Sequence, residues 1–220
     1  MKRLTKVLKF IRWRLHVGVF LNNFSKKIRG VNNLIKISSD AISNSKITIV
    51  GSNNSVHIEN SRFLRNLEIR ILGDDNHVFI GNSTWIKNSQ ILIEGDTNLC
   101  SIGAQCTIEG AEIFLTEKNT KLVIGEDCMF ADSIIFRTGD SHSIYDSATG
   151  LRLNSASNIE IGSHVWVAQG VTILKKSVVP NGSVVAAKSL VNKKFDESNI
   201  LIAGIPAKKM KNGIVWARER

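Results

Sequence analysis

The sequence is poor in proline and cysteine and has no long apolar run. Two prolines occur among 220 residues, and no stretch of about 18 apolar residues is present, which excludes a membrane-spanning helix. The first residues also lack the uninterrupted apolar core and the small-residue cleavage site of a signal peptide. The length suits one large domain rather than two.

The three cysteines are Cys100, Cys106 and Cys128. An odd number without the spacing of a disulfide framework is typical of a reducing compartment, so we expect a cytoplasmic protein. Cys106 and Cys128 lie one repeat apart in the pattern described below. This placement favours small, buried, apolar side chains over reactive thiols.

Acidic residues are absent from the N-terminal arm, residues 1–29. The formal net charge is +10, and this arm holds nine lysines or arginines. The rest of the chain is therefore close to neutral, which argues against nucleic acid as a partner. Leu4, Leu8, Ile11 and Leu15 share one helical face, and they predict a basic amphipathic helix.

Two uses of this helix remain open. Residues 1–25 can lie peripherally on the inner face of the cytoplasmic membrane, because anionic headgroups attract basic helices. Alternatively, the helix packs against the body of the protein or against a partner subunit.

From Gly51 onward, the chain divides into four blocks of 22 residues, each of which opens with a small polar cluster suited to a turn. Apolar residues recur at three positions of the block. These columns are Ile58, Ile80, Ile102 and Ile124; Leu64, Ile86, Ile108 and Phe130; and Ile69, Ile91, Ile113 and Ile135. Alternation with a period of two indicates strands, and a block is too short for a strand–helix–strand unit. The sequence therefore predicts stacked coils of short strands that pair in parallel.

The period tightens toward the C-terminus, where apolar residues recur every six positions and three hexads make an 18-residue triangular coil. The residues are Ile161, Val167, Ile173, Val179, Val185 and Val191. This segment resembles the hexapeptide-repeat acyltransferases, whose fold is a left-handed parallel β-helix. The handedness is implied by the resemblance, since crossovers are ordinarily right-handed. We expect an all-β protein with a β-helix over residues 30–192 and a short C-terminal helix or tail.

The repeat is interrupted once. Ile124 and its next equivalent, Ile161, are 37 residues apart instead of 22, so about 15 residues are inserted. A β-helix tolerates an insertion only as a loop that leaves its surface, and such loops commonly carry function. The inserted loop, residues 139–154, is rich in reactive side chains. They are Asp140, Ser141, His142, Tyr145, Asp146 and Arg152.

The segments RTGDSHSIYD, GLRLN and NIEIGSHVWVAQGVTIL resemble the polysaccharide O-acetyltransferase branch of the family, which includes capsule and polysialic acid O-acetyltransferases. The resemblance covers residues 120–210. It implies an enzyme that transfers acetyl from acetyl-CoA to a hydroxyl of a cell-surface polysaccharide, and it implies a homotrimer. It also implies that His142 is the catalytic base and that Trp166 lines the same site.

The expected chemistry suits a histidine. An imidazole with a pKa near neutrality can remove the proton of a hydroxyl while that oxygen attacks the thioester directly. Asp140, Asp146 or a backbone carbonyl can orient the imidazole, and backbone N–H groups from Ala168 to Gly170 can stabilise the oxyanion. Acceptor contacts are expected from four loop residues, of which the last can hold a carboxylate bidentately. They are Asp140, Ser141, Tyr145 and Arg152.

Other residues of the same types have simpler explanations. We expect a surface role for His164, although it is close to Trp166 in the sequence. His57 and His77 are expected on the surface of the coils. Trp85 has the same place in an earlier coil as Trp166, so packing remains an alternative role for Trp166.

In this family, coenzyme A lies in the groove between two subunits, beside the last coils, and residues 193–220 are expected to complete its site. Small side chains let pantetheine approach the backbone, and lysines after the G-x-P turn meet the phosphates. A solvated basic tail is the alternative for these lysines. The matching positions are Ala168, Ala186, Ala187, Lys188, Lys193, Lys208 and Lys211.

Other functions known for this fold agree less well with the sequence. A γ-type carbonic anhydrase needs three histidine ligands for zinc, and this half of the chain offers two, so we expect no metal site. Serine acetyltransferases and bacillosamine-type N-acetyltransferases usually carry a further N-terminal domain. We do not expect such a domain in this chain, so both classes are disfavoured. A purely structural β-helix leaves the histidine motif unexplained. An acetyltransferase for a small sugar or an antibiotic remains the alternative.

Overall fold

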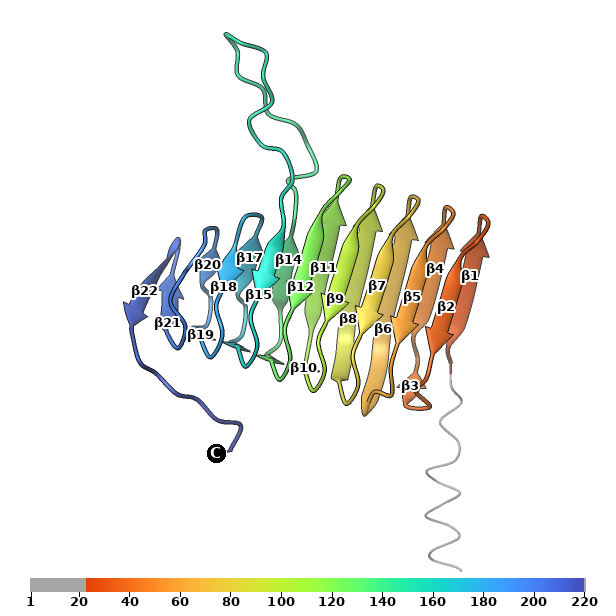
Figure 1. The fold of residues 1–220 in the computed structure, drawn as a ribbon, viewed down its shortest axis with the longest axis horizontal. Helices are drawn as coiled ribbons and strands as arrows, with labels where there is room; N and C mark the ends of the chain where they lie inside the picture. Colours follow the sequence, from red (N-terminus) through yellow and green to blue (C-terminus); the bar gives the residue numbers. More distant parts are fainter. Residues whose placement is uncertain (1–22, 220) are drawn as a thin grey trace, which may run out of the picture.

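The structure, a computed structural model, describes residues 23–219, and within that range it consists of strands and turns without a helix. The coils stack side by side into one parallel β-helix (Figure 1), which confirms the all-β prediction. The helix predicted for residues 1–29 lies mostly outside the described residues, but the end of that segment, Ser25–Arg29, is strand β1. None of the described residues belongs to a helix that is long and apolar enough to cross a membrane.

The strands make three faces. The first face contains β2 (Leu34–Ile37), β5 (Ser55–Ile58), β7 (His77–Ile80), β9 (Leu99–Ile102), β12 (Lys121–Ile124), β15 (Ile159–Ile161) and β18 (Val178–Val179). The second face contains β3 (Ile42–Ser43), β10 (Thr107–Ile108), β13 (Met129–Phe130), β16 (Trp166–Val167), β19 (Val184–Val185) and β21 (Leu201–Gly204). The third face contains β1, β4 (Lys46–Val50), β11 (Ala111–Thr116), β14 (Ile134–Arg137), β17 (Thr172–Leu174) and β20 (Leu190–Val191). Two long strands, β6 (Phe63–Leu72) and β8 (Trp85–Glu94), continue from the second face into the third.

Parallel pairing places the predicted apolar columns in register. Ile80 pairs with Ile58 on one side and with Ile102 on the other. Ile124 pairs directly with Ile161, so the column continues past the inserted loop. The side chains of this column are at most 3% exposed, and burial of such columns stabilises the stack.

One predicted column is wrong by one residue. Ile113 pairs with Phe136 and not with Ile135. The corner before β14 has one residue more than the equivalent corner before β11, and a slip of one residue turns side chains to the opposite face of a strand. As a result, Phe136 is 1% exposed and belongs to the core, whereas Ile135 lies outside it.

Buried asparagines stabilise the corner between the third and first faces. The Asn76 Nδ2 atom donates hydrogen bonds to Asn54 Oδ1 (3.1 Å) and to the carbonyl oxygen of Gly95 (2.9 Å). Asn98 N–H donates to Asn76 Oδ1 (2.9 Å), which extends the ladder by one coil. The side chains of this ladder are at most 1% exposed, and its bonds satisfy the amides of Asn54 and Asn76, whereas Asn98 Nδ2 has no partner among the described residues. Gly73, with φ of +144°, is required there because a Cβ atom would lie 2.1 Å from the Gly95 oxygen.

The three cysteines are buried and unpaired. Burial raises the pKa of Cys100 to about 12, so its thiol is protonated at neutral pH. Cys106 and Cys128 occupy equivalent places in successive coils, where they fill core space as predicted.

The β-helix ends in a hairpin. Strand β21 pairs in parallel with β19 and antiparallel with β22 (Ala207–Lys211). Parallel coils therefore extend from β1 to β21, beyond the predicted range 30–192 at both ends. Residues 212–219 follow as an extended tail, so the alternative of a C-terminal helix is not found among the described residues.

Candidate active site

The inserted loop leaves the β-helix between β14 and β15, at the corner where the third face meets the first (Figure 1). We call this the loop corner. The two arms of the loop are joined by hydrogen bonds from Leu153 N–H to the Ile144 oxygen (2.8 Å) and from Asp146 N–H to the Leu151 oxygen (2.9 Å). At the tip, Asp146 Oδ1 accepts a hydrogen bond from Thr149 N–H (2.7 Å). The loop is therefore an ordered excursion with its own backbone pairing.

Asn154, which the sequence analysis did not single out, organises the base of the loop. It is 9% exposed. Its Nδ2 atom donates to the carbonyl oxygen of His142 (2.8 Å) and to Asp140 Oδ2 (2.9 Å). Its Oδ1 atom accepts from Ile144 N–H (2.7 Å). These bonds fix the backbone of His142 to the coil.

The carboxylate of Asp140 also forms hydrogen bonds at the base of the loop. The Lys175 ammonium donates to Asp140 Oδ2 (2.6 Å) and to the Asn154 carbonyl oxygen (2.6 Å). The hydrogen bond from Lys175 is the main cause that lowers the pKa of Asp140. Asp140 and Asp146 thus have other partners within the chain, and neither of them hydrogen-bonds to the imidazole of His142 in the described residues.

Arg152 differs from its predicted role. Its guanidinium does hold a carboxylate bidentately, but that carboxylate belongs to Glu117 of the same chain, with Nη1–Oε2 and Nη2–Oε1 distances of 2.7 Å and 2.6 Å. Ser141 Oγ accepts a hydrogen bond from Arg137 (2.9 Å). Both side chains therefore stabilise the loop, whereas Tyr145 is 60% exposed.

The side chain of His142 is exposed on the loop. Within residues 23–219 its imidazole has no hydrogen-bond partner, while its backbone is held by Asn154. An imidazole in this setting has both ring nitrogens available to a substrate.

Trp166 opens β16 on the second face, and its outward side chain is partly exposed. It pairs with Met129 in the preceding coil and Val184 in the next. Trp85 belongs to the same column two coils before Met129, as the sequence predicted, and stacks on Phe63 at 4.4 Å. A tryptophan in this column can therefore serve packing alone, so position does not by itself assign function to Trp166.

His142 and Trp166 lie at different corners of the β-helix. The loop corner carries His142, whereas Trp166 follows the corner between the first and second faces. The first-face strand β15 separates the two corners in the chain. A single chain therefore does not bring the two predicted catalytic residues together.

Two of the three backbone donors predicted for the oxyanion are engaged within the β-helix. Ala168 N–H donates to the Val185 oxygen (2.9 Å), and Gly170 N–H donates to the Asp132 oxygen (3.0 Å). Both bonds belong to the pairing between coils. Within residues 23–219 no hydrogen bond involves Gln169 N–H, so of the three predicted donors Gln169 N–H is the one available to a developing charge.

His164 and the C-terminal tail form a cluster that the sequence did not reveal. His164 Nδ1 lies 2.7 Å from Asp127 Oδ2, and His164 Nε2 lies 3.2 Å from the carbonyl oxygen of Trp216. Both partners offer oxygen atoms, so each ring nitrogen of His164 faces a hydrogen-bond acceptor. Partial desolvation opposes ionisation of Asp127, but hydrogen bonds from His164 and Arg218 outweigh it and lower the pKa of Asp127.

The structure divides the predicted coenzyme A contacts between three places. Ala168, Ala186, Ala187 and Lys188 follow the ends of β16 and β19, where the second face turns into the third. Lys208 and Lys211 lie on β22, at the exposed edge of the terminal hairpin. Lys193 lies at the loop corner, beyond β20.

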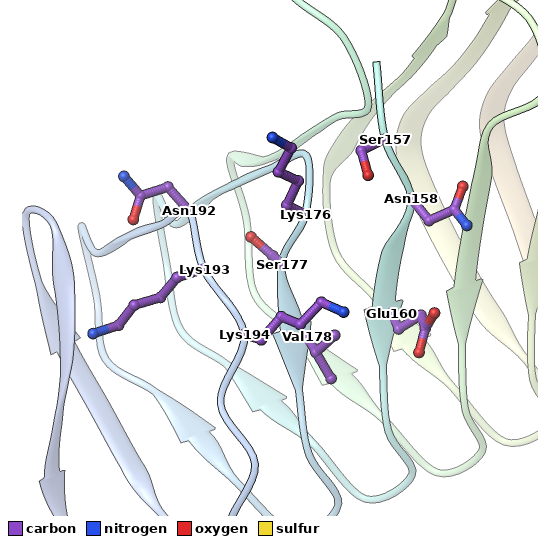
Figure 2. Close-up of a pocket in the computed structure, with 9 residues that line it drawn as sticks. All are labelled: Ser157, Asn158, Glu160, Lys176, Ser177, Val178, Asn192, Lys193 and Lys194. Carbon is purple, nitrogen blue, oxygen red and sulfur yellow. The ribbon is translucent and has the colours of Figure 1, made fainter. Parts of the chain in front are cut away.

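Lys193 also lines an open cavity of about 550 Å3 beside the loop corner (Figure 2). Lys176 and Lys194, which the sequence analysis did not single out, line it too, together with Glu160 and Ser157. Three ammonium groups against one carboxylate give this cavity a positive balance. Such a surface suits a phosphorylated ligand.

Comparisons with known proteins bear on the activity. No family model matches the chain. The chain is 36% identical over 85 residues to a polysialic acid O-acetyltransferase of Escherichia coli O1:K1 / APEC, a match that covers 39% of this chain and 27% of that protein. It is 37% identical over 76 residues to WbbJ of Escherichia coli strain K12, named for lipopolysaccharide biosynthesis O-acetyl transfer, with coverage of 34% and 38%. These matches span less than half of the length of either relative.

Structural similarity extends much further along the chain. The crystal structure of the polySia specific acetyltransferase NeuO superimposes with a TM-score of 0.77 and 33% sequence identity, and the match covers 90% of each chain. The shared region thus includes the β-helix well beyond the segments that carried the resemblance in sequence. The chain therefore belongs to the hexapeptide-repeat acyltransferases with a left-handed β-helix, in the branch of the polysialic acid O-acetyltransferases.

Proposed function

We propose that this protein transfers the acetyl group of acetyl-CoA to a hydroxyl of a cell-surface polysaccharide, in a capsule or a lipopolysaccharide. The observation that carries the proposal is the state of His142. Its backbone is fixed by Asn154 at 2.8 Å, while its imidazole is exposed and without a partner in the described chain. A base that must reach the hydroxyl of a large acceptor needs this combination of a fixed backbone and an open side chain.

The reaction is a direct transfer in a ternary complex. A ring nitrogen of His142 accepts the proton of the acceptor hydroxyl, and that oxygen forms a bond to the thioester carbonyl carbon. The carbon–sulfur bond then breaks, and the proton passes from the imidazolium to the departing thiolate. No covalent acyl-enzyme forms in this reaction. This agrees with the burial of all three cysteines, because none of their thiols is accessible as a nucleophile.

We propose that the site is completed by a second subunit of a homotrimer. His142 and Trp166 lie at separate corners of one chain, so a loop from one subunit must meet the second face of another. The loop has apolar side chains suited to such a contact: Ile144 is 57% exposed, Leu151 67% and Leu153 61%. Apolar side chains clustered on a protruding loop favour burial against a neighbour.

The co-substrate fits the same arrangement. The positive cavity with Lys176, Lys193 and Lys194 suits the phosphates of coenzyme A, and the small Ala186 and Ala187 leave room for its pantetheine arm. In a trimer, the loop corner of one subunit and the second face of the next can line one groove. The edge lysines Lys208 and Lys211 are a second candidate for the phosphates.

The buried, unpaired cysteines fit a cytoplasmic enzyme, and we propose that the arm of residues 1–25 keeps it at the inner face of the membrane. Deleting these residues should leave transfer to a dissolved acceptor intact and abolish binding to anionic vesicles. Unchanged vesicle binding contradicts the membrane role of the arm.

Release of free thiol from acetyl-CoA tests the activity, with polysialic acid, lipopolysaccharide and a panel of small sugars as acceptors. Turnover should require a polysaccharide, and His142→Ala should lower kcat by roughly 10²- to 10⁴-fold. His77→Ala is the matched control, because His77 is an exposed histidine of a coil. Turnover with small sugars alone, or a normal kcat for His142→Ala, contradicts the proposal.

A further inference from the structure

The C-terminal tail, residues 212–219, lies across several coils at the corner where the first face meets the second. It starts from the last coil, where Ile214 N–H donates to the Asn199 oxygen (2.9 Å). Farther along, Trp216 Nε1 donates to the His164 oxygen (2.9 Å). At the end of the tail, Arg218 Nη2 donates to the carbonyl oxygens of Cys128 (3.0 Å) and Gln105 (3.2 Å). The tail therefore runs back along the β-helix toward earlier coils.

Trp216 is the buried residue of this tail. It is 7% exposed, whereas its neighbour Val215 is 93% exposed. Its ring stacks on His164 with centroids 4.2 Å apart and an interplanar angle of 12°. A tryptophan buried on an otherwise exposed segment shows that the segment is docked through that side chain.

Trp216 also contacts the aromatic ring of the predicted active site. The centroids of Trp216 and Trp166 are 6.1 Å apart, with a tilt of 46°, within the range of favourable aromatic pairs. Met129 and Val184 flank Trp166 along its column. Trp216 therefore adds a contact from the tail that the coils alone do not supply.

The far end of the tail is held by charge. Arg218 Nε donates to Asp127 Oδ1 (3.0 Å), and Asp127 Oδ2 contacts His164 Nδ1 (2.7 Å). Arg218 Nη1 also donates to Thr107 Oγ1 (3.0 Å). Trp216 thus sits between anchors on both sides, which limits its movement relative to Trp166.

We propose that Trp216 is a positioning residue of the active site: the docked tail holds it against Trp166 and so fixes the indole that lines the reaction site. This inference rests on the proposed function, in which Trp166 belongs to the site that two subunits share. Misplacement of a site wall by about 1 Å can cost up to about 10²-fold in rate. The tail therefore belongs to the catalytic apparatus although it contributes no reacting atom.

The test compares kcat and KM of the full-length protein with those of Trp216→Ala, Trp216→Phe and Val215→Ala. Trp216→Ala should lower kcat by about 10- to 100-fold with little change in the KM for acetyl-CoA. Trp216→Phe keeps the stack on His164 and should restore most of the lost kcat. Val215→Ala should have no effect, because that side chain is exposed. A kcat for Trp216→Ala within about twofold of the normal value overturns the proposal.

A second variant covers the case in which Trp216→Ala fails to fold. Arg218→Ala keeps both tryptophans in the chain but removes the far anchor of the tail, so it should lower kcat and make tryptophan fluorescence more accessible to quenching by acrylamide. Greater accessibility with normal kcat also overturns the proposal. Trp166→Ala and His142→Ala are measured alongside. If these two retain activity, the proposed function has failed; if they lose it while the tail variants do not, only the inference about Trp216 has failed.

Discussion

The side chain of Asn154 donates a hydrogen bond to the carbonyl oxygen of His142, across 2.8 Å and twelve positions of the chain. This bond joins the end of the inserted loop to its beginning, at the residue proposed as the base. It fixes the backbone of His142 and leaves the imidazole open.

Asn154→Ala should impair catalysis more than folding. The substitution leaves the Ile144 N–H without its side-chain acceptor and the His142 oxygen without its side-chain donor, which we expect to cost about 1–3 kcal/mol locally. The core columns are untouched, so cooperative melting of the β-helix should persist. We expect kcat to fall by about 10- to 100-fold. Thr149→Ala, at the tip of the same loop, is the control, and an equal loss there argues against a specific role for Asn154.

Complementation between subunits tests the shared site. His142→Ala and Trp166→Ala chains should each be inactive alone, because every site then lacks one of its two residues. Unfolding and refolding the two variants together should restore part of the activity, because some interfaces then combine an intact loop with an intact second face. The measurement is acetyl transfer by mixed and unmixed refolded samples. No recovery in mixed oligomers contradicts a site shared between chains.

Lowering the pH should loosen the base of the loop. The pKa of Asp140 is depressed in the folded state, chiefly by the hydrogen bond from Lys175. Its contribution is therefore complete above the unfolded pKa of about 3.9 and is lost as the pH falls through the lower, folded value. Hydrogen exchange of loop amides between pH 5 and 2 measures this. Asp140→Asn should flatten the dependence, and an unchanged profile in that variant assigns the effect to another group.

Two sets of lysines are alternative candidates for binding the phosphates of coenzyme A. If the cavity beside the loop corner holds them, Lys193→Ala and Lys194→Ala should raise the KM for acetyl-CoA about tenfold with kcat preserved, since charge-assisted bonds contribute about 1.5–3 kcal/mol. Lys208→Ala and Lys211→Ala serve as the comparison. A larger effect from the second pair assigns the phosphates to the edge of the hairpin.

The fold was largely predictable because each coil repeats the same few interactions. The register between neighbouring coils follows directly from the spacing of Ile58, Ile80 and Ile102. The longer spacing between Ile124 and Ile161 locates the inserted loop. The sequence placed Ile135 in the core instead of Phe136, because a constant repeat length of 22 residues does not allow for the one extra residue in the corner before β14. The pattern of apolar residues predicts which side chains are buried, but it does not predict how many residues each corner of a coil contains.

The site was less predictable because its contacts are not periodic. Glu117 precedes Arg152 by 35 residues, and Arg218 follows Gln105 by 113, so nothing local marks either pair. Asn154 looks like any polar residue at the end of a loop. His142 belongs to a motif that carries the family resemblance, whereas Trp216 contacts His164 from 52 positions further along the chain, and no motif marks that contact.

The strict coil-to-coil register has a consequence for reach. Each coil contacts only its neighbours, so the number of coils between β1 and the inserted loop determines the distance between them. Adding or removing one 22-residue unit would shift the start of the β-helix relative to His142 by one strand spacing, about 4.8 Å, and leave the reacting groups unaltered. The distance between β1 and the inserted loop is thus set in discrete steps by the number of repeats.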